Sequence, residues 1–111
     1  ISDSDYIIDY VKEYLEKHYS DEISFETIAE NLKISRSYLS TYFKSKTNLN
    51  LSYYLSILRI NKACLLLKET GLSVKDVGHS IGIDNTNTFI RLFKQLKGVT
   101  PNTYRREASS S

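Results

Sequence analysis

Apolar residues recur along this chain at intervals of three and four positions, and no stretch reads as a strand. Such spacing is typical of amphipathic helices. Most of these stretches begin near Ser, Thr, Asp or Asn, whose side chains cap helix starts, and Gly or Asn follows several of them as a helix end. The sequence therefore predicts an all-α fold of about seven helices.

The longest predicted helix is the segment NLSYYLSILRINKACLLLKET, residues 50–70. Asn50 is expected to cap its start, and Gly71 is expected to end it in a left-handed turn. A helix of this length spans roughly 30 Å at about 1.5 Å per residue. Because similar segments precede and follow it, we interpret this helix as a rigid linker between two copies of one unit.

An internal repeat relates residues 24–49 to residues 73–99. Each copy has a capping serine, a short helix, a tight turn and a second helix, which is the layout of a helix-turn-helix. One extra residue follows the turn in the second copy. The matching pairs are Ser24 and Ser73, Ile28 and Val77, Ala29 and Gly78, Ile34 and Ile83, Leu39 and Phe89, Phe43 and Phe93, Lys44 and Lys94, and Tyr54 and Tyr104.

The repeat sets the expected domain organisation. We expect the first helix-turn-helix subdomain at residues 1–49, the linker helix at 50–70 and the second subdomain at 71–107. The last helix is expected to begin at Pro101, because proline is favoured at the first helical position, and to end near Arg106. Residues 108–111 are expected to form a disordered tail.

Charge is unevenly distributed along the chain, although the net charge is only +2. Residues 1–34 contain nine acidic and three basic side chains, a net −6, whereas residues 35–111 contain four acidic and twelve basic ones, a net +8. A chain that separates its charge in this way often binds a polyanion through its basic part.

Several classes of function have no support in the sequence. It contains no catalytic constellation, no glycine-rich phosphate loop and no nucleophile paired with a base, so neither an enzyme nor a cofactor is expected. Cys64, as the one cysteine, excludes an internal disulfide and a cysteine metal site. A chain with one cysteine suits a reducing cytoplasm, which is the expected location. No apolar run approaches the length of a membrane span, and no signal peptide is visible.

In a helix-turn-helix, the second helix enters the major groove of DNA. In the first copy, Leu39 and Phe43 are expected to face the core. The outer face then carries Arg36, Ser37, Ser40, Thr41 and Lys44. The short hydroxyl groups can reach base edges or phosphates with little selectivity, and the two cations suit phosphate neutralisation. This helix is expected to contribute more to holding the protein on DNA than to discriminating between base sequences.

In the second copy, Phe89 and Phe93 are expected to face inward. The outer face then carries Thr86, Asn87, Ile90, Arg91 and Lys94. Arg91 can form a bidentate pair with guanine and Asn87 with adenine, and each good pair is worth roughly 1–3 kcal/mol of discrimination. The alternative is a solvated polar face. The repeat, the charge separation and the turn signals together favour the DNA interpretation.

The motifs IAENLKISRSYLSTYFK, LRINKACLLL, VGHSIGI, FIRLFK and GVTPNTYR resemble the C-terminal DNA-binding domain of the AraC/XylS family of bacterial transcription regulators. The resemblance covers about residues 7–105. It implies two helix-turn-helix subdomains whose recognition helices enter successive major grooves of double-stranded DNA. By family position, Ser37, Ser40, Thr41, Thr86, Asn87 and Arg91 are base-facing, and Arg36, Lys44 and Lys94 contact the backbone.

The resemblance also implies partners. Many family members activate transcription by contacting RNA polymerase, so the expected function is that of an activator. Many carry a separate sensing or dimerisation domain, and the chain, which opens on ISDSD and contains no methionine, is expected to be a fragment that follows such a domain. The isolated domain is expected to be a monomer, and the full protein a dimer through the missing domain.

Three residues depart from the family pattern. Asn48 replaces the usual glycine but tolerates the left-handed conformation. Gly78 replaces the usual alanine, at about 1 kcal/mol of helix propensity, and Ile83 replaces an aromatic residue, so the second copy is expected to be looser. An alternative function is a protein-interaction module without DNA readout, which the acidic side chains of the first helix, Asp9, Glu13 and Glu16, favour.

Overall fold

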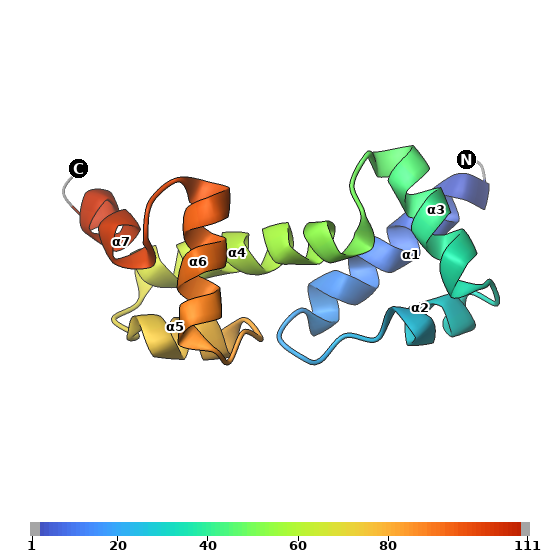
Figure 1. Cartoon of the computed structure of the whole chain (residues 1–111). Coiled ribbons are helices and arrows are strands. Elements are labelled where there is room, and N and C mark those ends of the chain that lie inside the picture. Colours follow the sequence, from blue (N-terminus) through green and yellow to red (C-terminus); the bar gives the residue numbers. More distant parts are fainter. Residues whose placement is uncertain (1–2, 110–111) are drawn as a thin grey trace. The chain divides into compact units, whose positions relative to one another are not determined.

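The computed structural model describes residues 3–109, and this range forms seven α-helices and contains no strand (Figure 1). The predicted all-α fold is therefore confirmed. The helices are α1 (Asp3–His18), α2 (Phe25–Asn31), α3 (Arg36–Thr47), α4 (Leu51–Glu69), α5 (Val74–Ser80), α6 (Thr86–Lys97) and α7 (Pro101–Ser109). The chain divides into two compact units, one ending at Leu55 and the other beginning at Ser56, so that the boundary falls within α4.

The first unit is built from α1, α2, α3 and the start of α4. Its core contains Val11, Leu15, Ile28, Ala29, Leu39, Phe43, Leu51 and Leu55. Leu39 and Phe43 are buried as the sequence predicts, and the Phe43 ring meets the Tyr54 ring edge-on at 5.5 Å between centroids. The opposite side of α3 is therefore the one that faces outward.

The second unit is built from the rest of α4 and from α5, α6 and α7. Its core contains Ile60, Ala63, Cys64, Leu67, Val77, Gly78, Ile81, Phe89, Phe93 and Pro101. Phe93 meets Phe89 and Tyr104 in edge-on contacts, with centroids 5.9 Å and 5.5 Å away. The repeat seen in the sequence thus has a structural counterpart, since Phe93 and Tyr104 pair as Phe43 and Tyr54 do.

Side-chain caps begin six of the helices, as their sequences predict. Ser24, Ser35, Asn50, Ser73, Asn85 and Thr100 each accept a hydrogen bond from the backbone N–H three residues later, over 2.8–3.3 Å. Each cap satisfies one of the N–H groups that a helix start leaves without a partner. For the first helix the sequence offers residues 2–5 as capping residues, and their side chains lie outside the described region.

Left-handed residues end several elements. Asn48 (φ 64°) ends α3 and Gly98 (φ 85°) ends α6, and each donates its N–H to the carbonyl four residues earlier. The turn inside each helix-turn-helix also has such a residue: Lys33 (φ 60°) in the first copy and Gly82 (φ 92°) in the second. Lysine is strained in this region, where glycine is not.

The predicted left-handed turn at Gly71 is wrong, because Gly71 does not have a positive φ. The end of α4 is instead covered by side chains. Thr70 Oγ1 donates to the Leu66 carbonyl over 2.6 Å, and Arg105 donates from Nε to Leu67 O over 3.0 Å and from Nη2 to Thr70 O over 3.3 Å. A cation at this position also complements the negative end of the helix dipole.

The end of the chain also differs from the prediction. Helix α7 continues to Ser109, so residues 108 and 109 are helical, whereas residues 110 and 111 lie outside the described range. The physical reason is the absence of a helix stop after Arg106: Glu107 and Ala108 are good helix formers, and no Gly or Pro follows.

Candidate nucleic-acid interface

Helix α3 presents a polar face opposite its buried Leu39 and Phe43. Ser37, Thr41 and Lys44 are exposed on it, as their spacing predicts, whereas Arg36 and Ser40 are only partly exposed. Lys44 Nζ lies 3.3 Å from the carbonyl oxygen of Asn48, at the end of the helix. The five residues predicted for this face therefore lie on one helix, but they differ in how freely they can reach a ligand.

Arg36 is tied to the helix that precedes α3. Its guanidinium carbon lies 5.1 Å from the centre of the Phe25 ring, and its Nε lies 3.9 Å from Oε2 of Glu26. Its Nη1 donates to Ser40 Oγ one turn along α3. The sequence pattern did not reveal these contacts. Phe25 and Glu26 belong to α2, and it is the tight turn between α2 and α3 that brings them close to Arg36.

Helix α6 presents a more open polar face. Phe89 and Phe93 are buried, while Asn87, Arg91 and Lys94 are exposed and Thr86 is partly exposed, as is Ile90 between them. Asn85 caps the helix through Oδ1, which accepts from the Thr88 N–H over 2.9 Å. The first two turns of this capped helix thus carry an exposed guanidinium and an exposed amide, which are the side-chain types that can pair with base edges through two hydrogen bonds.

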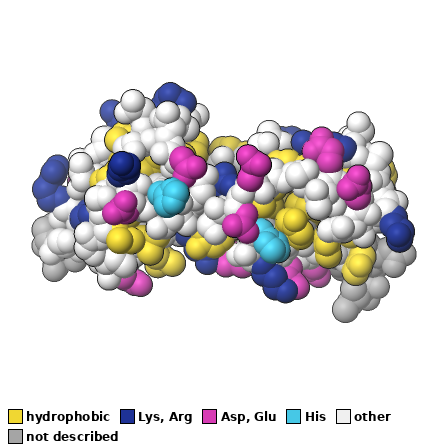
Figure 2. Space-filling view, turned by 90° about the horizontal axis from the view of Figure 1, so that it is seen from below, with side chains coloured by type: hydrophobic (Ala, Val, Ile, Leu, Met, Phe, Trp, Pro, Cys, Tyr) yellow, Lys and Arg dark blue, Asp and Glu magenta, His cyan; other side chains and the backbone are white. Residues whose placement is uncertain are grey.

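The two units differ in charge. On the face drawn in Figure 2, acidic side chains lie among basic and hydrophobic ones, so that face has no uniform sign. The first unit, to Leu55, holds nine acidic and six basic side chains, a net −3, and the second holds four acidic and nine basic ones, a net +5. Attraction to a polyanion is therefore concentrated in the second unit.

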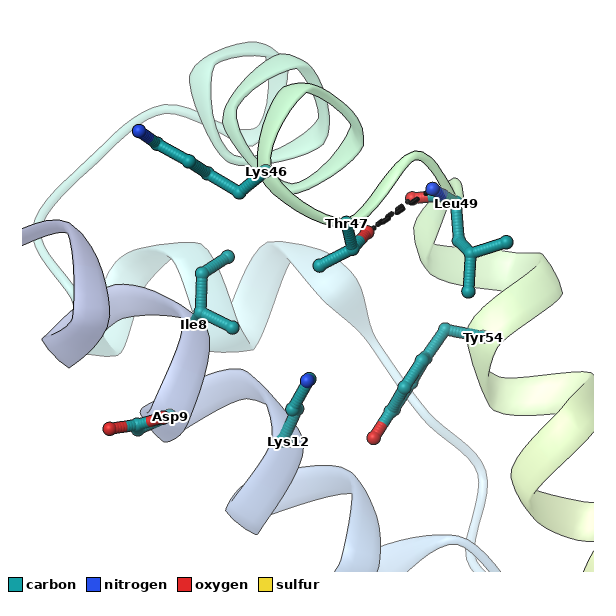
Figure 3. A pocket seen from close by; sticks show the side chains of 7 residues that line it. All are labelled: Ile8, Asp9, Lys12, Lys46, Thr47, Leu49 and Tyr54. Carbon is teal, nitrogen blue, oxygen red and sulfur yellow. Dashed lines mark hydrogen bonds between the residues drawn. The ribbon is translucent and has the colours of Figure 1, made fainter.

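A cavity of about 370 Å³ in the first unit is not predictable from the sequence (Figure 3). It is lined by Ile8, Asp9, Lys12, Lys46, Thr47, Leu49 and Tyr54. The Lys12 ammonium lies 5.9 Å from the centre of the Tyr54 ring. Burial, and to a lesser degree the Glu16 carboxylate, raises the pKa of Tyr54, which favours its neutral form.

Other kinds of site find little support. In the described part of the chain, no three His, Cys, Asp or Glu side chains gather as metal ligands would. Among residues 3–109, no helix is both long enough and apolar enough to span a membrane. The single cysteine is a packing residue: Cys64 is buried, and its side chain, with burial as a smaller cause, raises the pKa of the Tyr104 phenol.

Comparison with known proteins agrees with this geometry. A family model described as a helix-turn-helix domain matches residues 28–107. The chain is 34% identical over 104 residues to the HTH-type transcriptional regulator YtdP of Bacillus subtilis, covering 94% of this chain and 14% of that protein. It is 34% identical over 98 residues to the HTH-type transcriptional activator RhaS of Enterobacter sp., covering 88% of this chain and 35% of that protein.

Among solved structures, the C-terminal domain of AraT, a response regulator from Geobacillus stearothermophilus, superposes with a TM-score of 0.86 at 33% identity, covering 91% of this chain and 84% of that one. The fold and the two outward polar helices define a double helix-turn-helix DNA-binding domain. The chain belongs to the AraC/XylS family of transcription regulators, which is not a family of enzymes. The chain covers only part of its relatives: it corresponds to between 14% and 57% of the length of four similar regulators.

Proposed function

We propose that this chain reads a specific double-stranded DNA sequence by placing α3 and α6 in successive major grooves, within a bacterial transcription activator. The observation that supports this most directly is the outer face of α6. Asn87 and Arg91 are both exposed there, four residues apart, on a helix whose other side is held by Phe89 and Phe93. Residues at that spacing share a helix face and can contact neighbouring bases.

Arg91 and Asn87 carry the discrimination in this proposal, and Thr86 supports them. Ser37, Ser40 and Thr41 contact the DNA from α3, where hydroxyl groups select less strongly. Lys44 and Lys94 neutralise phosphates, since both are exposed and occupy equivalent positions in the two recognition helices. The +5 charge of the second unit favours initial electrostatic capture through that unit.

Activation rests on similarity rather than on geometry. One relative carries the name of a transcriptional activator, and this chain spans about a third of it. We propose that the complete regulator activates by contacting RNA polymerase, and that a domain outside this chain senses a signal or dimerises. The isolated chain would then be a monomer in the cytoplasm that binds its DNA site weakly.

The test is selection of duplexes from a random library by the unmodified chain, followed by anisotropy titration of Arg91→Ala. The substitution should cost roughly 1–3 kcal/mol and relax the preference at one base pair. Arg106→Ala is a matched control, because Arg106 is also an exposed arginine of the second unit but lies on α7. It should leave the preference unchanged.

Two results would contradict the proposal. If Arg91→Ala weakened binding equally for all sequences, Arg91 would be a phosphate contact and base readout by α6 would be wrong. If the unmodified chain bound no duplex at low salt, DNA binding by this chain would be wrong. The protein-interaction function would then be favoured, with the acidic side chains of α1 as the surface to test.

A further inference from the structure

We infer that Arg36 is not a backbone contact but a positioning residue, which holds the Ser40 hydroxyl so that it donates a hydrogen bond to the DNA. This inference rests on the proposed function, because it concerns how α3 reads a base edge. It differs from the sequence expectation, in which Arg36 neutralises a phosphate directly.

Three contacts hold the guanidinium on the protein. It packs on the Phe25 ring at 5.1 Å, faces the Glu26 carboxylate at 3.9 Å and donates to Ser40 Oγ. Its Nε is enclosed, with no hydrogen-bond partner in the described residues, so that atom is not available to a phosphate. Turning the guanidinium fully toward the DNA backbone would break these contacts and separate Arg36 from the carboxylate that offsets its charge.

The bond from Arg36 determines what Ser40 can do. A hydroxyl group has one hydrogen to donate and two lone pairs that accept. Because a guanidinium can only donate, Ser40 must be the acceptor in this pair, and its own hydrogen is left to point elsewhere. Ser40 is partly exposed on the outer face of α3, so the hydrogen is available to an acceptor on DNA. Guanine O6 and N7, adenine N7 and thymine O4 are such acceptors, whereas the cytosine amino group is not.

The second unit provides an internal comparison. By the alignment of the repeat, the positions of Phe25, Glu26, Arg36 and Ser40 are occupied there by Val74, Lys75, Thr86 and Ile90. All four members of the network are replaced, and the carboxylate is replaced by a cation. The second unit therefore lacks this network, and the residue at the position of Ser40 there, Ile90, has no hydroxyl group to orient.

The experiment measures binding to the selected duplex as a function of salt for the unmodified chain, Arg36→Met, Ser40→Ala and the double variant. Lys44→Met is the control for a phosphate contact, and it should lower the slope of log K against log salt by about 0.9. Arg36→Met should leave that slope unchanged. Arg36→Met and Ser40→Ala should each reduce the preference at the same base pair by about 2- to 10-fold, the equivalent of one hydrogen bond, and the double variant should lose no more than either single variant.

A decrease in slope for Arg36→Met as large as that for Lys44→Met would overturn the inference, and so would additive losses in the double variant. If Arg36→Met does not fold, as judged by circular dichroism, Arg36→Lys replaces it: it keeps the charge but loses the planar fork, so it should keep the slope and lose the preference. Failure of the proposed function has a different signature, because the unmodified chain would then select no duplex at all, and the inference would fall with it.

Discussion

Gly78 is the residue for which the structure and intrinsic helix propensity give opposite predictions. It lies within α5, and alanine in a helix is more favourable than glycine by about 1 kcal/mol. Yet a Cβ atom on Gly78 would lie 3.0 Å from Phe89 Cδ2 and 3.1 Å from both Phe89 Cγ and the Ile83 carbonyl oxygen. Phe89 is fully buried, so its ring cannot move into solvent to make room.

The magnitude follows from these two opposing terms. Overpacking a closed core typically costs about 1–3 kcal/mol, which equals or exceeds the gain in propensity. Gly78→Ala should therefore lower the free energy of unfolding of the second unit by up to about 2 kcal/mol. In the first unit the equivalent positions are occupied by Ala29 and Leu39, and both residues are buried. An alanine is therefore accommodated there beside a leucine in place of a phenylalanine.

This internal precedent gives a double-mutant cycle. Phe89→Leu alone should also destabilise, by about 1–2 kcal/mol, because it leaves a cavity beside Gly78. The double variant Gly78→Ala, Phe89→Leu recreates the pair of the first unit, so it should be more stable than the sum of the single variants predicts, by about 1–2 kcal/mol. Urea unfolding followed by circular dichroism, with amide exchange of α5 and α6 to report on the second unit, measures these values.

Gly71→Ala is the matched control for adding a methyl group to a glycine. A Cβ on Gly71 meets nothing within 4 Å, and its φ is not positive. This substitution should stabilise by about 0.4–1 kcal/mol through the unfolded state. The packing argument is refuted if Gly78→Ala stabilises as Gly71→Ala does, or if the cycle shows no coupling between positions 78 and 89.

Two further predictions concern local strain and pH. Lys33→Gly should stabilise by about 0.5–1 kcal/mol, because Lys33 has φ 60° where its counterpart is a glycine; Lys33→Ala, which keeps the Cβ, should show no such gain in urea unfolding. The raised pKa of Tyr54 means that the folded chain binds this proton more tightly than the unfolded chain does. The contribution of the neutral Tyr54 side chain to folding stability is complete below its pKa in the unfolded chain, about 10. This contribution is lost as the pH rises through the pKa of Tyr54 in the folded chain. When the pH is raised from about 8 to about 11, the melting temperature of the Tyr54→Phe variant should therefore fall less than that of the unmodified chain. An equal fall in both would contradict the raised pKa of Tyr54.

Much of the fold was predictable because its signals are local. A capping residue and the N–H that it binds are three positions apart, and the periodic apolar residues that mark each helix lie within one or two turns. The long helix was less predictable in detail. Its buried residues in the first unit include Leu51 and Leu55, those in the second include Ile60, Ala63 and Leu67, and the step from Leu55 to Ile60 interrupts the spacing. No single apolar stripe therefore runs along α4.

The features that escaped prediction depend on contacts between distant residues. The end of α4 is covered by Arg105, which lies 38 positions after Leu67, so the sequence around Gly71 gave no sign of it. Arg36 was correctly placed on α3, but the position of its side chain is set by Phe25 and Glu26 on the preceding helix. A periodic pattern gives the direction in which a residue leaves its helix and does not give the partner that holds the side chain.

The two units consequently have different physical properties on the same scaffold. The second unit has a net charge of +5 and an exposed Arg91, so on the proposed function it would be attracted to DNA at long range, before any sequence is recognised. The first unit has a net charge of −3, and its recognition helix holds Arg36 against Glu26, so long-range forces do not favour its approach to phosphates. On the proposed function, α3 gains binding energy only through short hydrogen bonds that need correct alignment. A mismatched base pair beneath α3 would then leave the first unit detached while the second unit remains bound. The helix that discriminates less strongly, α3, would therefore decide whether both units bind the DNA.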